Sequence, residues 1–187
     1  MAKALDQILV IDVESTCWEN YPPPGQTTEI IEIGLCTVDA ASLERIEKRC
    51  LMVRPQKSTV SPFCTSLTSI TQEMAESGMT LGEAVTILMD EYQAPHRLFA
   101  SWGDYDRNQF RRNCEMYGIP YPFGPTHLNV KNLYSIGLGL RQELGIDSAM
   151  ERLGLTMTGT HHRGVDDAWN IADLLCRLLK RMRRVGL

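Results

Sequence analysis

Residues 8–16 read ILVIDVEST, a run of aliphatic side chains interrupted by two carboxylates, Asp12 and Glu14. Successive side chains of a β-strand point to opposite faces of the sheet, and both faces of this segment are apolar along most of its length. The segment therefore predicts a central strand that is covered on two sides. Asp12 and Glu14 share one face with Ile8 and Val10, which places two like charges side by side within the fold.

Two ionised carboxylates in a buried strand carry a large desolvation cost unless a partner neutralises them. No lysine or arginine lies near Asp12 and Glu14 in the sequence. Such a pair either raises a pKa or shares a cation. Adjacent carboxylate oxygens suit a hard divalent ion such as Mg²⁺ or Mn²⁺. From this stretch alone, an exposed strand end at which both groups are merely solvated explains the pattern equally well.

The overall composition is that of an ordinary globular chain. Its 187 residues, 43% hydrophobic and 22% charged, predict a single domain over residues 1–187. The net charge of −4 argues against a general polyanion binder, so any contact with nucleic acid is expected to be local. Six scattered cysteines form no CxxC pair, which argues against a structural zinc site and a disulfide framework. Without a recognisable signal peptide or membrane-length apolar run, we expect a reduced, cytoplasmic protein that does not bind a membrane.

The alternation of apolar patterns and turn residues predicts the secondary structure. We expect strands over 8–14, 29–39, 45–55 and 97–103, a short strand at 127–130, and helices over 80–92, 104–117, 131–143, 147–153 and 164–184. Short connections between the first three strands predict an antiparallel meander. Strands followed by alternating helices and strands are typical of an α/β domain with a mixed sheet.

The helix expected over 104–117 carries a further acid. Phe110 and Cys114 belong to its apolar stripe, and Asp106 lies four residues before Phe110. Asp106 therefore continues the stripe and is expected to point inward. Asp104 falls on the polar side and is expected to be an N-cap or surface residue. An inward acid on an apolar stripe again requires a partner.

The last predicted helix repeats this pattern. Asp167 lies on the apolar line with Ile171, whereas Asp166 lies on a polar line and is expected to be solvated. His162, in a loop flanked by glycines, precedes Asp167 by five residues. A histidine beside metal-bound carboxylates can accept a proton from water near neutral pH. His161 is the competing candidate, and a His-His pair in a loop is by itself commonly a surface feature.

Three motifs together carry a family resemblance. The segments IDVESTCWE (11–19), SWGDYD (101–106) and HRGVDDAWNIA (162–172) resemble those of the DEDDh, or DnaQ-like, 3′→5′ exonuclease superfamily. The match is most specific to its Eri-1-like branch, which includes the histone-mRNA 3′ exonucleases. The resemblance implies an RNase H-like α/β fold, with a mixed sheet and helices on both faces. The spacing of the family motifs also selects His162 over His161 and Asp106 over Asp104.

The resemblance implies a metal-dependent enzyme that releases nucleoside 5′-monophosphates from the 3′ ends of single-stranded RNA or DNA. Two Mg²⁺ or Mn²⁺ ions per active site would be held by Asp12, Glu14, Asp106 and Asp167. His162 would accept the proton of the attacking water. Bound cations would let an acidic chain process a polyanion. Two alternatives fit similar features: a small-substrate phosphodiesterase or oligonucleotidase, and a non-catalytic regulator that binds nucleic-acid ends.

Candidates for substrate binding rest on weaker signals. Ser15 and Thr16 follow the acids, where hydroxyl and backbone N–H groups could meet a terminal 3′-OH. Phe63, Leu67 and Trp102 are candidates for an apolar slot around the last base, since stacking on aromatic side chains tolerates any sequence. Core packing is an equally good explanation of these three. No motif indicates a contact to a 2′-OH, so the sequence does not choose between RNA and DNA.

Glu32, in the segment EIIEIG (29–34), is a further acid on a strand. It shares a face with Ile30 and Gly34. We expect it either to orient a metal ligand or the ribose, or to form an ion pair.

Overall fold

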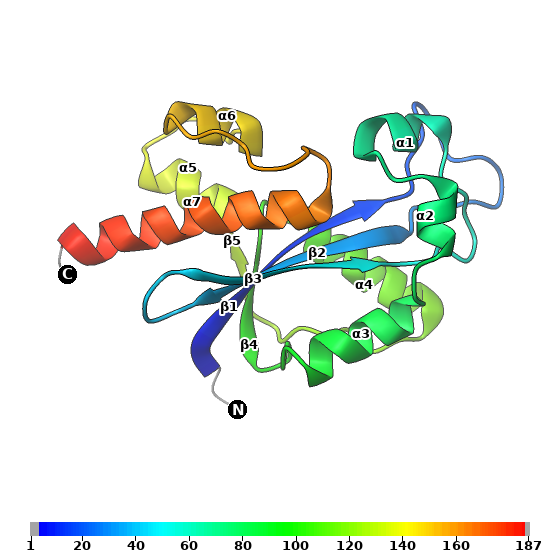
Figure 1. Ribbon diagram of the computed structural model, residues 1–187, viewed down its shortest axis with the longest axis horizontal. Helices are drawn as coiled ribbons and strands as arrows, with labels where there is room; N and C mark the ends of the chain where they lie inside the picture. Colours follow the sequence, from blue (N-terminus) through cyan, green and yellow to red (C-terminus); the bar gives the residue numbers. More distant parts are fainter. Residues whose placement is uncertain (1–3, 186–187) are drawn as a thin grey trace.

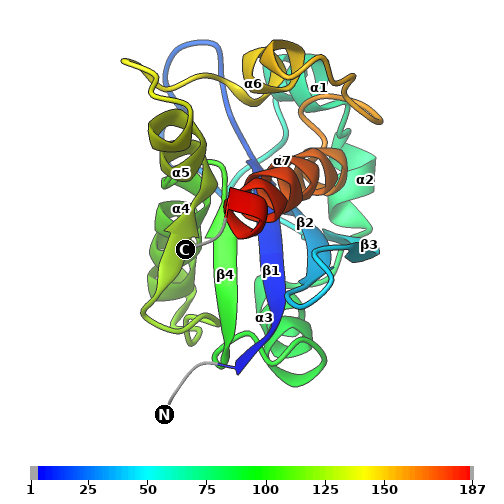
Figure 2. The same cartoon turned by 90° about the vertical axis from the view of Figure 1, so that its left-hand side faces the viewer.

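The computed structural model describes residues 4–185 and shows a five-stranded mixed sheet between two layers of helices (Figures 1 and 2). The strand order is β3-β2-β1-β4-β5. Neighbours β1, β2 and β3 pair antiparallel, whereas β4 pairs parallel with β1 and with β5. The strands are β1 (Ala4–Ser15), β2 (Ile30–Asp39), β3 (Arg45–Met52), β4 (Arg97–Ser101) and β5 (His127–Asn129). The expected meander and the mixed-sheet α/β class are confirmed.

Helices pack on both faces of this sheet. They are α1 (Pro62–Thr68), α2 (Gln72–Glu76), α3 (Leu81–Asp90), α4 (Tyr105–Tyr117), α5 (Val130–Gly137), α6 (Ile146–Arg152) and α7 (Gly164–Val185). Ile8 and Val10 of β1 pack in one core with α5, α6 and α7, while Leu9 and Ile11 pack in the other core with α3 and α4. The predicted two-sided burial of β1 is therefore confirmed. Within residues 4–185, no helix has the length and apolar character needed to cross a bilayer.

Helix α5 is shorter than expected. The apolar pattern predicted a helix to residue 143, but α5 ends at Gly137. Gly139 adopts a left-handed backbone with φ of 63°. Two glycines within three residues favour termination, because glycine is a poor helix former and takes positive φ freely.

Helix α7 crosses the sheet above β1 and β2 (Figures 1 and 2) and approaches β2 closely at one point. A Cβ atom added to Gly34 of β2 would lie 1.9 Å from the carbonyl carbon of Gly164, the first residue of α7. A Cβ on Gly164 would lie 2.8 Å from the carbonyl oxygen of Asp12. This pair of glycines lets the start of α7 rest directly on the backbone of β1 and β2.

We expect Gly34→Ala to lower the free energy of unfolding by about 3 kcal/mol, because the new methyl group meets backbone that cannot rotate away. Urea denaturation measures the change. Gly82→Ala is the matched control, because its Cβ would meet nothing nearer than 3.8 Å inside helix α3. It should stabilise the chain by about 0.5–1 kcal/mol. Similar stabilities for the two variants would contradict the close contact.

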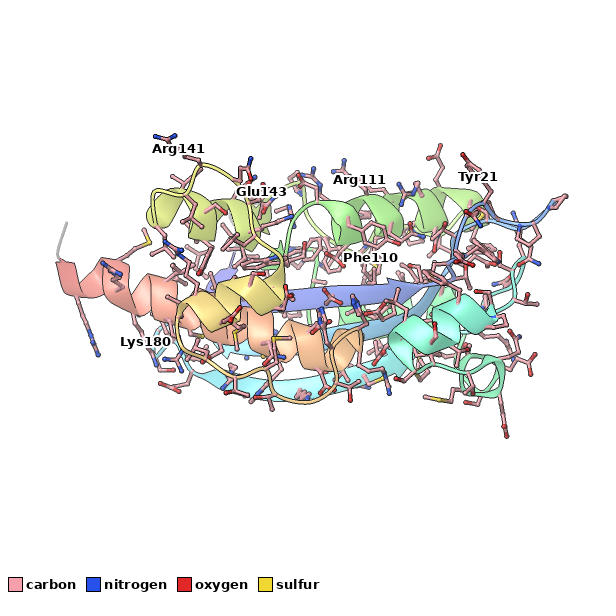
Figure 3. The ribbon with its side chains drawn as sticks, turned by 90° about the horizontal axis from the view of Figure 1, so that it is seen from above. Tyr21, Phe110, Arg111, Arg141, Glu143 and Lys180 are labelled. Atoms are coloured by element: carbon pink, nitrogen blue, oxygen red, sulfur yellow. The ribbon has the colours of Figure 1, made fainter. Side chains whose placement is uncertain are left out.

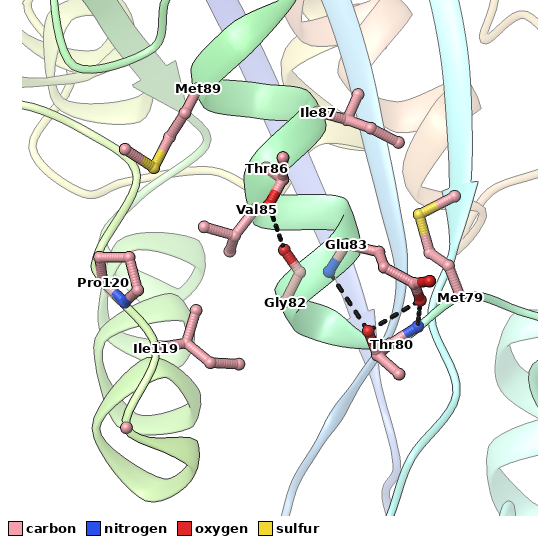
Figure 4. Close-up of a pocket in the computed structure, with 11 residues that line it drawn as sticks. Met79, Thr80, Gly82, Glu83, Val85, Thr86, Ile87, Met89, Ile119 and Pro120 are labelled. Atoms are coloured by element: carbon pink, nitrogen blue, oxygen red, sulfur yellow. Dashed lines mark hydrogen bonds between the residues drawn. The ribbon is translucent and has the colours of Figure 1, made fainter.

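An apolar groove of about 830 Å³ lies between α3 and the segment that follows α4 (Figure 4). Its walls include Val85 and Met89 of α3 and, opposite them, Ile119 and Pro120. The start of α3 is fixed by a capping box, in which the Thr80 hydroxyl accepts from the Glu83 N–H and the Glu83 carboxylate accepts from the Thr80 N–H. No residue of this groove lines the cleft that contains the acids.

Candidate active site

Four chain segments meet at one edge of the sheet and form a cleft of about 250 Å³. Strand β1 contributes residues from its carboxyl end, α4 from its first turn and the residues before it, α6 from its first residue, and α7 from its first turns and the loop before it. Parallel strands β1 and β4 end at this same edge, where ligands commonly bind in open α/β sheets. The lining residues are Asp12, Val13, Glu14, Trp102, Tyr105, Asp106, Ile146, His161, His162, Asp167 and Ile171.

The centre of the cleft is a cluster of carboxylates. Oxygen atoms of Asp12, Glu14 and Asp167 lie within 4.8 Å of one another, although Asp167 is more than 150 residues away in the chain. Asp12 and Glu14 are partly buried and Asp167 is 4% exposed. Among the described residues, no lysine or arginine forms an ion pair with any of the three.

Asp106 lies on the wall of the same cleft but outside this three-carboxylate cluster. It is 3% exposed, and its Oδ1 accepts a hydrogen bond from the Val13 N–H at 2.9 Å. This bond ties the first turn of α4 to β1, between the two acids of that strand. Further along α4, Phe110 points toward the sheet and Arg111 points away from it (Figure 3), as the predicted apolar stripe requires.

Asp104 occupies the N-cap position of α4 but makes no capping hydrogen bond. Its side chain is 49% exposed and pairs with Arg107 at 3.1 Å. The predicted contrast between an inward Asp106 and an outward Asp104 matches these positions.

Enclosure makes it difficult for these carboxyl groups to ionise without a cation. Burial raises the pKa of Asp12 well above the usual carboxyl range, and the neighbouring charges of Asp106 and Glu14 raise it further. Burial also raises the pKa of Glu14 to about 8, with the charge of Asp167 as the next cause. For Asp106, burial raises the pKa to about 6 against the opposing hydrogen bond from Val13. Burial also raises the pKa of Asp167. Four cleft acids with raised pKa values offer oxygen ligands that suit hard divalent cations.

The pH dependence of stability should reveal this cluster. Glu14 has a folded-state pKa of about 8 against an ordinary value of 4.5. Its contribution to stability is therefore fully present below pH 4.5 and is lost as the pH rises toward 8. Mn²⁺ should restore the loss, because it binds the ionised carboxylates of the folded chain.

We accordingly expect Mn²⁺ to raise Tm more at pH 8 than at pH 6. Differential scanning calorimetry with and without Mn²⁺ at both pH values measures the two shifts. An equal or smaller shift at pH 8 would contradict a cluster of raised carboxyl pKa values.

Both histidines of the preceding loop line the cleft, with their rings stacked at a centroid distance of 3.9 Å. His161 Nδ1 lies 3.2 Å from Asp167 Oδ1, and the backbone N–H of His162 donates to Asp167 Oδ2 at 2.9 Å. His162 has a left-handed backbone with φ of 61°. Burial, together with the adjacent His161, lowers the pKa of the His162 imidazole below its usual value. A neutral imidazole of this kind can accept a proton near pH 7.

The acid next to Asp167 is less solvated than expected. Asp166 forms an ion pair with Lys48 of β3 and accepts a hydrogen bond from the Thr160 N–H. Asn170, one turn further along α7, is 1% exposed. Its side-chain oxygen accepts a hydrogen bond from the Thr158 N–H, and its side-chain NH₂ donates to the Thr158 carbonyl. Asp166 is therefore less solvated than predicted, because Asp166 and Asn170 both hold the loop that carries the histidines.

The candidate substrate-binding residues are in different environments. Trp102 lines the cleft and donates its Nε1–H to the Leu144 carbonyl at 3.1 Å. Phe63 and Leu67 lie on α1, 40% and 39% exposed, outside the set that lines the cleft. Ser15 is buried at the end of β1.

Thr16 is fully buried, and its donors are used within the protein. Its N–H donates to the Glu29 carbonyl, and its hydroxyl donates to the Thr27 carbonyl and accepts from the Glu29 N–H. These bonds fasten the loop after β1 and leave neither donor of Thr16 for a terminal 3′-OH.

Tyr105 is a cleft residue that the sequence analysis missed. It is 50% exposed and lines the cleft directly before Asp106 in the chain. Its position could have indicated this, because Tyr105 lies in the first turn of a predicted helix, directly before an acid that was expected to point inward. Its ring can offer a stacking surface to a base.

Comparisons with known proteins identify relatives of this chain. A family model, RNase_T, described as an exonuclease, matches residues 9–175. The probable 3′-5′ exonuclease KapD of Bacillus subtilis (strain 168) is 31% identical over 165 residues, which cover 87% of this chain and 80% of KapD. Human 3′-5′ exoribonuclease 1 is 30% identical over 188 residues, which cover 94% of this chain. The match spans only 53% of that human protein.

Among solved structures, the nuclease domain of 3′hExo, described as a DEDDh family member and bound to rAMP, superposes with a TM-score of 0.86. It is 27% identical, and the match covers 97% of this chain and 95% of that domain. Full-length 3′-exonuclease superposes equally well at 28% identity, with the match covering 63% of its chain.

Proposed function

The chain belongs to the RNase_T exonuclease family as a 3′–5′ exonuclease of the DEDDh type, and from this premise we propose how it acts and on what. Its substrate is the 3′ end of single-stranded nucleic acid, with RNA preferred over DNA, and its products are nucleoside 5′-monophosphates. Two divalent ions, Mg²⁺ or Mn²⁺, are its cofactors. The carboxylate cluster of Asp12, Glu14 and Asp167 is the observation that carries this proposal. The preference for RNA is supported by the name of the human exoribonuclease and by the rAMP bound to the 3′hExo domain.

The chain's own residues divide the work of hydrolysis among them. Asp12, Glu14 and Asp167 would hold the cations, and Asp106, which lines the same cleft, would complete the ligand set. Bound divalent cations supply neutralisation of the phosphate charge and a lowered pKa for the attacking water. His162 would accept the proton of that water.

The cleft also limits which part of a polymer can react. Tyr105 and Trp102 flank the acids and offer ring surfaces to the terminal nucleotide. Base stacking on such rings is insensitive to sequence. A volume of about 250 Å³ is small for a ligand pocket, which favours a site that takes a chain end and cleaves one residue at a time.

Degradation of matched labelled oligonucleotides tests this function. Single-stranded RNA and DNA of one sequence are incubated with Mg²⁺ or Mn²⁺, with and without EDTA. We expect a ladder that shortens from the 3′ end, disappears with EDTA and forms faster on RNA, with 5′-monophosphates as products. An RNA blocked by a 3′-phosphate is the control for the requirement for a free end.

Three outcomes would overturn the proposal in distinguishable ways. Faster degradation of DNA would reverse the sugar preference alone. Hydrolysis restricted to dinucleotides would indicate a small-substrate phosphodiesterase. Tight binding of RNA without any product would indicate a regulator of nucleic-acid ends.

A further inference from the structure

Glu32 of β2 is a fully buried carboxylate, 0% exposed, that collects several donors. Arg163 donates to it from Nε at 2.9 Å and from Nη2 at 3.4 Å. The backbone N–H groups of Gly164 and Val165 donate at 3.3 and 3.4 Å, and the Cys50 thiol donates at 3.1 Å. An ion pair this well enclosed is held in one geometry, because each polar group already has a partner.

The groups that Glu32 holds are those that start α7. Gly164 and Val165 provide N–H groups of the first helical turn, which have no partner within the helix. A negative charge at this end also interacts favourably with the helix dipole. Asp167 follows within the same turn, so the placement of its carboxylate over β1 depends on how this turn is anchored.

Arg163 extends the same anchor into the histidine loop. It directly follows His162, and its backbone N–H bonds the Thr160 carbonyl. The Glu32–Arg163 ion pair thus fixes the chain on one side of His162, while the bond from the His162 N–H to Asp167 fixes it on the other. The Glu32 carboxylate thus holds both the histidine loop and the start of α7.

Glu32 has an electrostatic disadvantage that packing alone does not require. Its charge adds to the repulsion that Asp12 and Glu14 experience. A buried ion pair of this kind is often replaceable by apolar residues without loss of stability. The presence of a carboxylate near these acids is therefore better explained by a role in positioning other groups than by a contribution to stability.

We propose that Glu32 is a positioning residue, which acts through Arg163 and the first turn of α7 to place Asp167 and His162 against Asp12 and Glu14. This inference rests on the proposed metal-dependent function of the same cleft. Some residues orient metal ligands without touching the metal themselves. Their substitution commonly lowers metal affinity or activity by about 10–100-fold.

Glu29 provides a matched control for Glu32. It lies one residue before β2 and is 1% exposed. Its carboxylate is equally well bonded, to the N–H groups of Gln56 and Lys57 and to the Tyr117 hydroxyl. None of these partners lines the acidic cleft or belongs to α7.

The test compares Glu32→Gln with Glu29→Gln in the full chain. Titration calorimetry with Mn²⁺ gives the Kd, and degradation of labelled RNA, well below each variant's Tm, gives kcat and KM. For Glu32→Gln we expect the Mn²⁺ Kd to rise and kcat to fall, each by about 10–100-fold, with KM for RNA changed less than about twofold. Glu29→Gln should lower Tm, while its Mn²⁺ Kd and kcat stay within about twofold of the wild type.

A second variant keeps the test decisive if Glu32→Gln does not fold. Arg163→Gln leaves Glu32 and its N–H donors in place and should change Mn²⁺ Kd and kcat in the same direction. Wild-type Mn²⁺ affinity and kcat in a folded variant of this pair would overturn the inference while leaving the proposed function intact. Absence of Mn²⁺ binding in the wild-type chain would overturn both.

Discussion

Asp12→Asn should leave the chain folded and lower kcat/KM on RNA by at least about 10³-fold, a loss of roughly 4 kcal/mol of transition-state stabilisation. The charges of Asp106, Glu14 and Asp167 all act on Asp12, so its carboxylate would contribute to any cation that these acids share. An amide has nearly the same shape but no charge, and it should therefore empty the cation site. Degradation of labelled RNA measures the loss.

The same substitution should raise the Tm of the metal-free protein at pH 8. Burial and the neighbouring charges of Asp106 and Glu14 raise the pKa of Asp12, so ionising this group at high pH opposes folding, and an uncharged amide avoids that cost. Inactivity combined with higher stability separates loss of a metal ligand from misfolding. Asp104→Asn is the control and should retain activity, since the partners of this exposed acid among residues 4–185 are Arg107 and His127, and neither lines the cleft. An Asp104→Asn variant as inactive as Asp12→Asn would contradict the assignment.

His162→Ala should lower kcat by about 10²–10⁴-fold while leaving Mn²⁺ affinity nearly unchanged. The imidazole lines the cleft, and its lowered pKa keeps it neutral and able to accept a proton. It is not one of the three carboxylates that are expected to hold the cations, although a ring nitrogen of His162 lies within 4.8 Å of an Asp167 oxygen. Single-turnover kinetics at saturating Mn²⁺ measures the change.

His161→Ala is the matched control for His162. His161 approaches Asp167 through its ring, so its loss should affect the placement of that carboxylate more than proton transfer. We expect the smaller fall in kcat for His161→Ala. If His161→Ala proved the more damaging variant at saturating Mn²⁺, the proton acceptor would be His161.

Local periodicity was sufficient to predict the parts of the fold that depend on burial alone. The alternation of Ile8 and Leu9 along β1 predicted its two covered faces, and the two helical cores contain these residues as expected. The four-residue step from Asp106 to Phe110 predicted which acid of α4 points inward. Each pattern depends only on the geometry of one strand or one helix, so it can be read from the residues of that segment alone.

Features that depend on contacts between distant segments were not predictable in this way. The sequence predicted a solvated Asp166, but in the structure it pairs with Lys48. The sequence also predicted that Thr16 could bind a terminal 3′-OH, but its hydroxyl bonds Thr27 and Glu29 within the protein. Glu32 and Arg163 are 131 residues apart, and no periodicity within either segment predicts that they pair. The tertiary fold is needed to show which acids face the cleft and which are bonded to other parts of the protein.

A crystal of the protein grown with Mn²⁺, measured for anomalous scattering at the manganese edge, tests most directly whether these acids converge in order to bind divalent ions. We expect two peaks about 3.5–4 Å apart, contacted by Asp12, Glu14, Asp106 and Asp167. Full manganese saturation of the crystal without a peak between these carboxylates would contradict the account.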